Sequence, residues 1–213
     1  MSDGIIQKLT EIFEKFPGIG PRQAKRFVYS LIKEDESFIK EFLKLVSELK
    51  TRVKICEKCF RIFEEGAPLY SSKKLCPVCN DSGRDASKLL LVEKDTDFEN
   101  IEKSGVYKGL YFVLGGVVSP LDPSSQKKLR LKNLFSRAEK EAGKTLKELI
   151  IATSATREGD TTALYIQRIL EPFSKKGAIK ITRLGKGLQT GAELEYSDME
   201  TLKHALLNRS ELK

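Results

Sequence analysis

The sequence predicts a multi-domain α+β protein: a helical N-terminal region, a four-cysteine segment, an α/β parallel sheet, and a C-terminal tail of helix and strand. Three observations lead to this prediction. Apolar residues recur at helical spacing in roughly the first 50 residues. The four cysteines then stand in two close pairs, and after them short apolar runs alternate with helical stretches. We expect regions at residues 1–54, 55–84, 85–175 and 176–213.

Composition limits the classes of protein that the chain can belong to. Of its 213 residues, 40% are hydrophobic and 32% are charged, as in ordinary globular proteins. The apolar runs are too short to cross a membrane, and the N-terminus does not resemble a signal peptide. We therefore expect a cytoplasmic protein that makes no membrane contact. The net charge of +8 favours a partner with a phosphate backbone, although a solvated basic surface is the simpler explanation.

A break rich in glycine and proline separates the first two expected helices. The run 16–21 reads Phe-Pro-Gly-Ile-Gly-Pro, and its second proline suits the first position of the next helix. Free backbone N–H groups at that helix start could bind a phosphate. This is a helix-hairpin-helix pattern, which is typical of DNA binding without sequence preference; the alternative is a plain turn beside a solvated basic face. The candidate DNA-binding residues are Gly18, Gly20, Arg22, Lys25 and Arg26.

The cysteines have the spacing of metal ligands. Cys56 and Cys59 form one C-x-x-C pair, and Cys76 and Cys79 form the other. Four thiolates complete a closed tetrahedral site, which predicts one structural Zn²⁺ per chain and no open position for chemistry. An iron–sulfur cluster also uses four cysteines and is the alternative. In a cytosolic protein, paired cysteines favour a metal over disulfides.

The second half of the chain alternates strands and helices. Strands are expected at 89–92, 111–114, 149–152 and 179–181, and helices at about 96–104, 127–142, 160–173 and 198–208. Strand–helix–strand succession predicts a parallel sheet with right-handed crossovers. Two further signals are weaker: the basic run 126–132 is either a solvated helix start or a DNA-contacting surface, and the glycines of 185–191 lack the pattern of a phosphate-binding loop.

Acidic residues follow two of the expected strands. Glu93 ends the first strand, and Glu158 and Asp160 follow the third. These segments resemble the Toprim fold of topoisomerases, primases and related nucleases. The catalytic members carry an Asp-x-Asp pair, and this chain has Ser154 and Thr156 at those positions. Hydroxyl groups do not replace anionic ligands for Mg²⁺. The resemblance therefore implies a Toprim domain that is not an enzyme, whose three acids form a partner-binding or structural cluster, or a weak Mg²⁺ site.

The order of these parts is more specific than any one of them. A helix-hairpin-helix, four cysteines and a Toprim domain without its acidic pair closely resemble the RecR family of recombination mediators over essentially the whole chain. Further motifs carry the resemblance at 82–85, 111–116, 119–122 and 187–196. One departure is plain: sixteen residues separate Cys59 from Cys76, more than is usual in the family, and we expect a surface loop around 64–70.

The resemblance implies a function in DNA repair and recombination. RecR-like proteins assemble as dimers or tetrameric rings that act as a clamp on double- and single-stranded DNA at the nucleoid. With RecO, and in some organisms RecF, they load RecA onto single-stranded DNA. Two alternatives stay open at this point: a Mg²⁺-dependent Toprim nuclease or primase-like enzyme, and a pure protein–protein adaptor with a zinc module.

Overall fold

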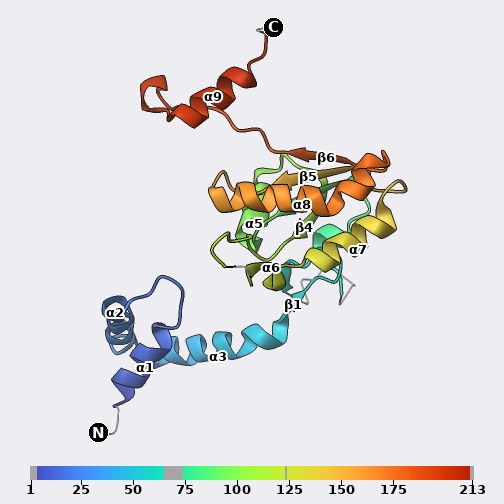
Figure 1. Cartoon of the computed structure of the whole chain (residues 1–213). Coiled ribbons are helices and arrows are strands. Elements are labelled where there is room, and N and C mark those ends of the chain that lie inside the picture. Colours follow the sequence, from blue (N-terminus) through green and yellow to red (C-terminus); the bar gives the residue numbers. More distant parts are fainter. Residues whose placement is uncertain (1–3, 65–73, 123, 212–213) are drawn as a thin grey trace. The chain divides into compact units, whose positions relative to one another are not determined.

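A computed structural model describes residues 4–64, 74–122 and 124–211 (Figure 1). The chain divides into two compact units, Met1–Val53 and Lys54–Lys213, and each is described by itself. Most of the loop expected around 64–70 lies outside the described residues. Within the described part of the chain, no helix is long and apolar enough to cross a membrane.

The described residues of the N-terminal unit form three helices: α1 (Ile5–Phe13), α2 (Pro21–Leu31) and α3 (Glu36–Arg52). Helices α1 and α2 pack against each other, burying Thr10, Ala24 and Val28. The ring of Phe13 meets that of Phe27 edge-on, with 5.7 Å between the ring centroids. Asp35 caps the start of helix α3, and its carboxylate accepts a hydrogen bond from the Phe38 N–H at 2.8 Å.

The second unit contains the predicted parallel sheet. Its strands are β3 (Asp85–Val92), β4 (Gly109–Val113), β5 (Glu148–Ala152) and β6 (Lys180–Arg183), arranged in the order β4-β3-β5-β6. All three pairings are parallel, with Leu90 of β3 level with Tyr111 of β4 and Ile150 of β5. The two central strands are apolar on both faces, as a sheet covered on both sides requires. The expected fold class is confirmed.

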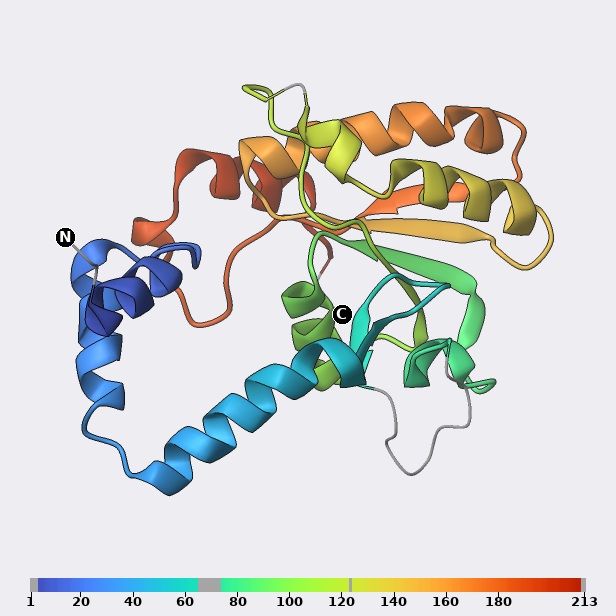
Figure 2. The same ribbon diagram turned by 90° about the horizontal axis from the view of Figure 1, so that it is seen from below.

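Both faces of this sheet are covered, one by helices alone and the other by a helix together with the cysteine segment. The connecting elements are α5 (Asp95–Ser104), α6 (Ser125–Lys128), α7 (Leu131–Glu141), α8 (Arg157–Lys175), η1 (Leu194–Tyr196) and α9 (Met199–Leu207). One apolar core joins alternate strand residues to α7 and α8, and the other joins the remaining ones to α5 and the cysteines. Figure 2 shows α7 and α8 on one side of the sheet and α5 with the cysteine segment on the other.

The expectation of one helix at 127–142 is wrong, because the chain forms α6 and α7 with an extended residue, Leu129, between them. The break has a structural reason. The Arg130 N–H donates to the Leu114 carbonyl at 3.0 Å, and its guanidinium donates to the Val113 carbonyl at 2.9 Å. Arg130 is therefore tied to β4 and is not a solvated cation at a helix start.

The cysteine segment forms a small hairpin and one helical turn, which the sequence did not predict in detail. It contains β1 (Val53–Ile55), β2 (Ile62–Glu64) and α4 (Pro77–Asn80), and β1 pairs with β2. The turn of this β-hairpin, residues 56–61, is called the cysteine turn and lies along the outer edge of β4. There the Val113 N–H donates to the Cys59 carbonyl at 2.8 Å. The segment therefore covers the edge of the sheet, where unpaired backbone groups would otherwise face solvent.

A buried arginine completes this contact. Arg137 of α7 donates through Nη1 to the carbonyls of Tyr111 and Lys58, both at 3.0 Å, and through Nε to Glu141 at 3.2 Å. Its side chain is only 7% exposed. One guanidinium thus joins β4, the cysteine turn and α7. An arginine this buried is stabilised by the hydrogen bonds it makes, and its loss would leave a buried carbonyl without a donor.

Replacing Arg137 with Met keeps much of the side-chain volume but removes these three hydrogen bonds. We expect the free energy of unfolding to fall by about 2–4 kcal/mol, because the Tyr111 carbonyl stays buried without its donor. Denaturant unfolding measures this loss. Lys140→Met is the matched control: it lies on the same helix with an exposed side chain, and should change stability by less than about 0.5 kcal/mol. Equal losses in both variants would contradict the role of Arg137.

Candidate metal centre and nucleic-acid interface

The four cysteines come together at one point. Their sulfur atoms all lie within 4.8 Å of one another, and the Cys59 and Cys76 sulfurs are 3.5 Å apart. Sulfurs bound to one Zn²⁺ at about 2.3 Å in a tetrahedron are separated by about 3.8 Å, whereas a disulfide would hold two of them at about 2.05 Å. Cys56, Cys59 and Cys76 are buried and Cys79 is partly buried. The sulfur positions fit a metal ion enclosed by four thiolates.

Local backbone geometry places each pair. The Phe60 N–H donates to the Cys56 carbonyl, and the Cys56 N–H donates to the Arg61 carbonyl, both at 2.9 Å. Phe60 adopts a left-handed conformation, with φ at 62°, which is unusual for a bulky residue. Its ring packs on Phe112, with 5.3 Å between the ring centroids, and lies against the apolar core of the sheet. The turn is therefore shaped by the sheet beneath it.

The second pair uses a helix start. Cys76 is the N-cap of α4, and Pro77 occupies the first helical position. The Cys76 N–H lies 3.4 Å from the Cys56 sulfur and donates to it. Such N–H···S contacts favour the thiolate form and so help to hold a cation at the centre.

Hydrogen bonds among the four thiols shift their pKa values in opposite directions. Hydrogen bonds from the thiols of Cys59, Cys76 and Cys79 lower the pKa of Cys56. The pKa of Cys59 is raised, because its proton is shared with Cys56 and because burial disfavours its charged form. The pKa of Cys79 is raised for the same two reasons. A bound metal must therefore displace protons from Cys59 and Cys79.

The hairpin between α1 and α2 has the geometry that the sequence predicted. Gly18 has a φ of 78°, which favours glycine, and the Ile19 N–H closes the turn on the Phe16 carbonyl at 3.1 Å. Gly20 caps α2 and Pro21 opens it, and no side chain caps the first turn. A side-chain carbon at Gly18 or Gly20 would meet no other atom within 4 Å, so this backbone is open to a partner.

Basic side chains surround the start of α2. Arg22, Lys25 and Arg26 are all exposed, and the Lys25 ammonium lies 5.9 Å from the centre of the Tyr29 ring. Unpaired N–H groups at a helix start and nearby cations together suit a phosphate. All five candidate DNA-binding residues thus lie on this one turn and the helix that follows it.

Glu93 lies at the end of β3, where the sequence placed it, and its carboxylate is already bonded. It is 3% exposed and accepts hydrogen bonds from the Ser154 N–H at 2.7 Å and the Ser154 hydroxyl at 3.0 Å. Thr156, the second residue in place of an acid, caps α8 by accepting from the Gly159 N–H at 3.1 Å. Both hydroxyls therefore have structural contacts of their own.

The residue between Glu158 and Asp160 has to be a glycine. A side-chain carbon at this position would lie 2.0 Å from the Ser154 carbonyl oxygen, so only glycine lets α8 begin so close to the strand end. Asp160 accepts hydrogen bonds from Arg183 and, at 3.0 Å, from Lys186, and these two cations lower its pKa. Glu158 is exposed.

The structure does not gather the three acids into a metal site. Among the described residues, the four cysteines are the only set of three or more His, Cys, Asp or Glu side chains close enough to share one ion. Sequence reasoning also missed the structural roles of Arg137 and Lys186. Both side chains donate to acceptors far away in the sequence, which the order of residues does not reveal. The sequence therefore held no signal for either residue beyond its positive charge.

Comparison with known proteins agrees with this architecture. A family model described as "Toprim domain" matches residues 87–185, and one described as "RecR, C-terminal" matches residues 190–210. The chain is 38% identical over 207 residues to "Recombination protein RecR" of Prochlorococcus marinus subsp. pastoris, covering 97% of this chain and 96% of the relative. Proteins of the same name from Chlorobium phaeobacteroides and Bifidobacterium longum subsp. infantis are 36% and 35% identical, with 97% or more of every chain covered.

The fold and the site define a Toprim-domain protein with a four-cysteine cluster that can hold a metal ion and with a helical hairpin. Identity above 30% over nearly the full length assigns it further: the chain belongs to the RecR family of recombination proteins. Its role is in recombinational repair. The relatives are named as recombination proteins, in agreement with the expectation that this protein is not an enzyme.

Metal binding should depend on pH in a defined direction. The ligands are thiolates, and binding must displace protons from Cys59 and Cys79, so affinity falls as the pH falls. Because thiols release protons when they bind the metal, we expect the apparent affinity for Zn²⁺ to drop by at least about tenfold for each pH unit below neutrality. Competition with a chromophoric chelator between pH 5.5 and 7.5 measures this slope. An affinity independent of pH would contradict a thiolate site.

Proposed function

We propose that the protein is a DNA-binding recombination mediator that forms a clamp and acts with RecO, alone or together with RecF, to load RecA onto single-stranded DNA. One observation carries the proposal: similarity to proteins named "Recombination protein RecR" extends over 97% of the chain. It therefore includes the hairpin, the metal centre, the Toprim domain and the tail together.

DNA binding is assigned to the hairpin that ends at α2. Gly18 and Gly20 leave their backbone open, and Arg22, Lys25 and Arg26 stand exposed beside them. Contacts to phosphates position a protein on DNA without reading the bases, which suits a mediator that must act at any sequence. The net charge of +8 favours both double- and single-stranded DNA as ligands.

Zn²⁺ is the metal proposed for the four cysteines, one ion per chain. Thiolates favour soft or borderline ions over Mg²⁺ and Ca²⁺, and the short turns around Cys56 and Cys76 are typical of structural zinc sites. The four sulfurs complete the coordination shell, so the ion stabilises the fold and takes no part in a reaction. Its removal should loosen the cysteine turn first and then the β4 edge that the turn covers.

Self-association is supported by helix α3. None of its residues is buried, although it carries a stripe of apolar side chains at helical spacing. The stripe consists of Phe38, Phe42, Leu45, Val46 and Leu49, which are 37–58% exposed. Contiguous apolar surface of this kind marks a protein interface. We propose that further copies of the chain cover it in a dimer or tetrameric ring.

A structural role is proposed for Glu93 and Asp160 and a partner-binding role for Glu158, in preference to a magnesium site. Glu93 and Asp160 already accept hydrogen bonds from their neighbours, so neither carboxylate is free to bind an ion without losing them. Glu158 is exposed at the start of α8 and offers a negative charge to a partner protein.

The mediator function is tested by filament assembly. With RecA, RecO and single-stranded DNA coated by its binding protein, adding this chain should shorten the lag before RecA filaments form. Fluorescence of labelled DNA follows the assembly. If the lag is the same with and without the chain, across a range of chain concentrations, the proposed mediator function is wrong.

The hairpin assignment has its own test. The double variant Lys25→Glu, Arg26→Glu should bind DNA at least about tenfold more weakly, and the dependence of log affinity on log salt should become shallower by about one to two units. Fluorescence anisotropy with a labelled oligonucleotide measures both quantities at several salt concentrations.

The matched control is Lys103→Glu, Lys140→Glu, which makes the same change in net charge at exposed positions of the other unit. It should retain most of the affinity. If both double variants lose the same affinity, the DNA responds to overall charge and the hairpin has no special role.

A further inference from the structure

The two edges of the sheet differ. The β4 edge is covered by the cysteine turn, whereas β6 forms the other edge with only β5 beside it. The Lys180 N–H donates to the Lys147 carbonyl at 2.8 Å, and the Leu184 N–H donates to the Ile151 carbonyl at 3.2 Å. Since backbone groups alternate along a strand, those of Ile181 and Arg183 point away from β5. Among the described residues, none provides a backbone partner for them.

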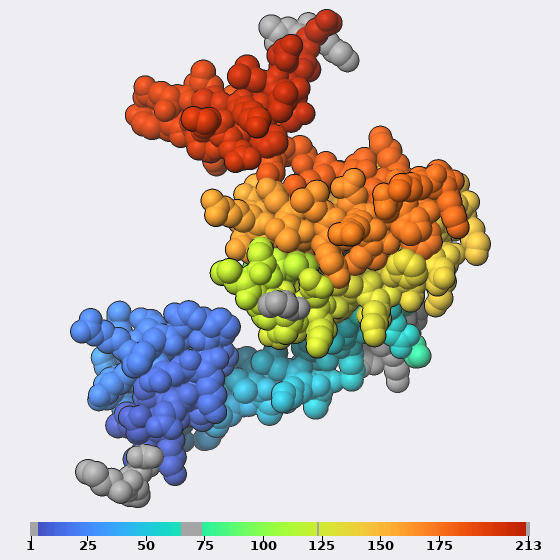
Figure 3. Space-filling model, in the orientation of Figure 1, coloured from blue at the N-terminus to red at the C-terminus, as the bar shows by residue number. Residues whose placement is uncertain are grey.

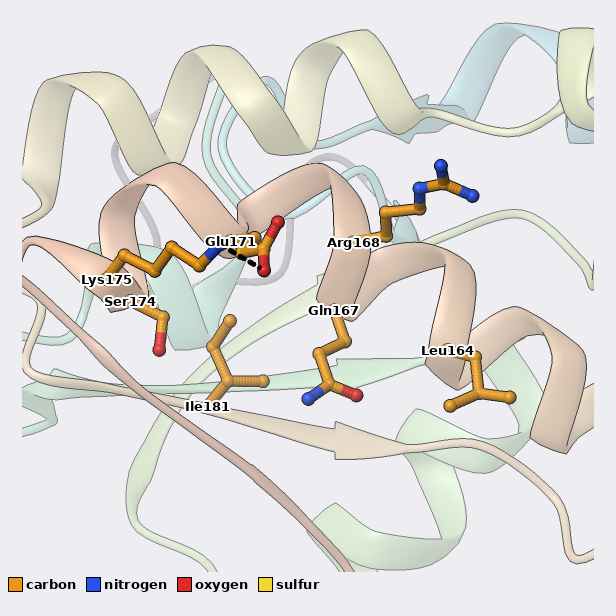
Figure 4. Close-up of a pocket in the computed structure, with 7 residues that line it drawn as sticks. All are labelled: Leu164, Gln167, Arg168, Glu171, Ser174, Lys175 and Ile181. Carbon is orange, nitrogen blue, oxygen red and sulfur yellow. Dashed lines mark ion pairs between the residues drawn. The ribbon is translucent and has the colours of Figure 1, made fainter.

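A groove lies beside this edge. It has a volume of about 440 Å³ and runs between β6 and the side of α8 that faces it, with Ile181 on its floor (Figure 4). The α8 residues that line it are Leu164, Gln167, Arg168, Glu171, Ser174 and Lys175. Leu164 is 66% exposed, so an apolar surface is available next to the unpaired backbone.

The charge along this edge of the sheet is positive. Glu171 is paired with Lys175 at 2.8 Å, and Asp160 is paired with Arg183. Arg168 and Lys180 have no ion pair with any described residue. The two acids are therefore already neutralised by neighbours, and two cations are left to attract an acidic partner.

A second copy of the same strand does not suit this edge. If two β6 strands paired antiparallel about a twofold axis, the Lys180 and Arg183 side chains of both copies would lie along one short seam. Like charges close together across a strand pair destabilise it. Basic residues on an edge strand oppose pairing with the same edge of another copy but leave it open to an acidic strand.

We propose that β6 is a docking edge for an extended, acidic segment of a partner protein, which adds a fifth strand to the sheet. The outward N–H and C=O groups of Ile181 and Arg183 supply two donors and two acceptors. An apolar side chain of the segment enters the groove beside Ile181 and Leu164, while its carboxylates reach Arg168 and Lys180. Main-chain bonds give such a complex its affinity and the groove gives it specificity. This docking edge is separate from the hairpin, and it meets the acidic strand ends only where Arg183 pairs with Asp160.

A displayed library of random eight-residue segments, selected against the full-length protein, tests the proposal. The enriched sequences should alternate acidic with apolar residues. The best one, made as a labelled peptide, should bind about tenfold more weakly to Arg168→Glu and to Ile181→Pro. Proline at 181 removes an outward N–H and leaves the bonds to β5 in place. Ile181→Val keeps that N–H and should bind as the wild type does.

Three results would overturn the proposal. The first is the absence of enrichment, or enrichment of sequences without acidic residues. The second is equal binding of the peptide to the wild type and to Ile181→Pro, with circular dichroism showing that the variant is folded. The third is a change in oligomeric state on Ile181→Pro, measured by light scattering, because the edge would then belong to another copy of the chain.

Discussion

The hydrogen bond from the Val113 N–H to the Cys59 carbonyl joins the sheet to the cysteine segment within the second unit. It makes the cysteine turn the neighbour of an edge strand that would otherwise be open. Arg137 joins the same two segments a second time. Its guanidinium donates to the carbonyl of Tyr111 in β4 and to that of Lys58 in the cysteine turn. The cysteines share one apolar core with β3, β4 and α5. The metal centre is therefore part of the sheet domain and does not form a domain of its own.

The residues that follow β4 also bond to the end of β3, where Glu93 lies. Just beyond β4, Leu114 and Gly115 donate to the carbonyls of Val92 and Glu93 at 2.9 Å. Glu93 in turn holds Ser154 with both carboxylate oxygens. A continuous chain of contacts thus leads from the metal centre to the place where catalytic Toprim domains bind their ions. Here that place is closed by hydroxyl hydrogen bonds, which accounts physically for a Toprim fold in a recombination protein that is not an enzyme.

The sequence predicted the features that depend on spacing and on local chemistry. Two C-x-x-C pairs predicted a four-sulfur cluster, the Pro-Gly-Ile-Gly run predicted the hairpin, and apolar runs predicted every strand of the parallel sheet. The sequence-based prediction failed where contacts between residues far apart in the chain determine the structure. Arg130 breaks the helix expected at 127–142 because it reaches Val113, and the cysteine turn covers β4 because Arg137 holds both. A pattern of residue types does not contain these pairings, since they arise only after the sheet has formed.

Hydrogen exchange of the Val113 amide, with and without bound metal, tests the central claim most directly. If the metal centre holds the β4 edge through the Cys59 carbonyl, removing the metal should speed exchange at Val113 by about tenfold or more, while amides of the central strand β3, such as that of Leu91, keep their protection. Unchanged protection at Val113 after complete metal removal would contradict the account, because the edge would then be closed without the metal centre.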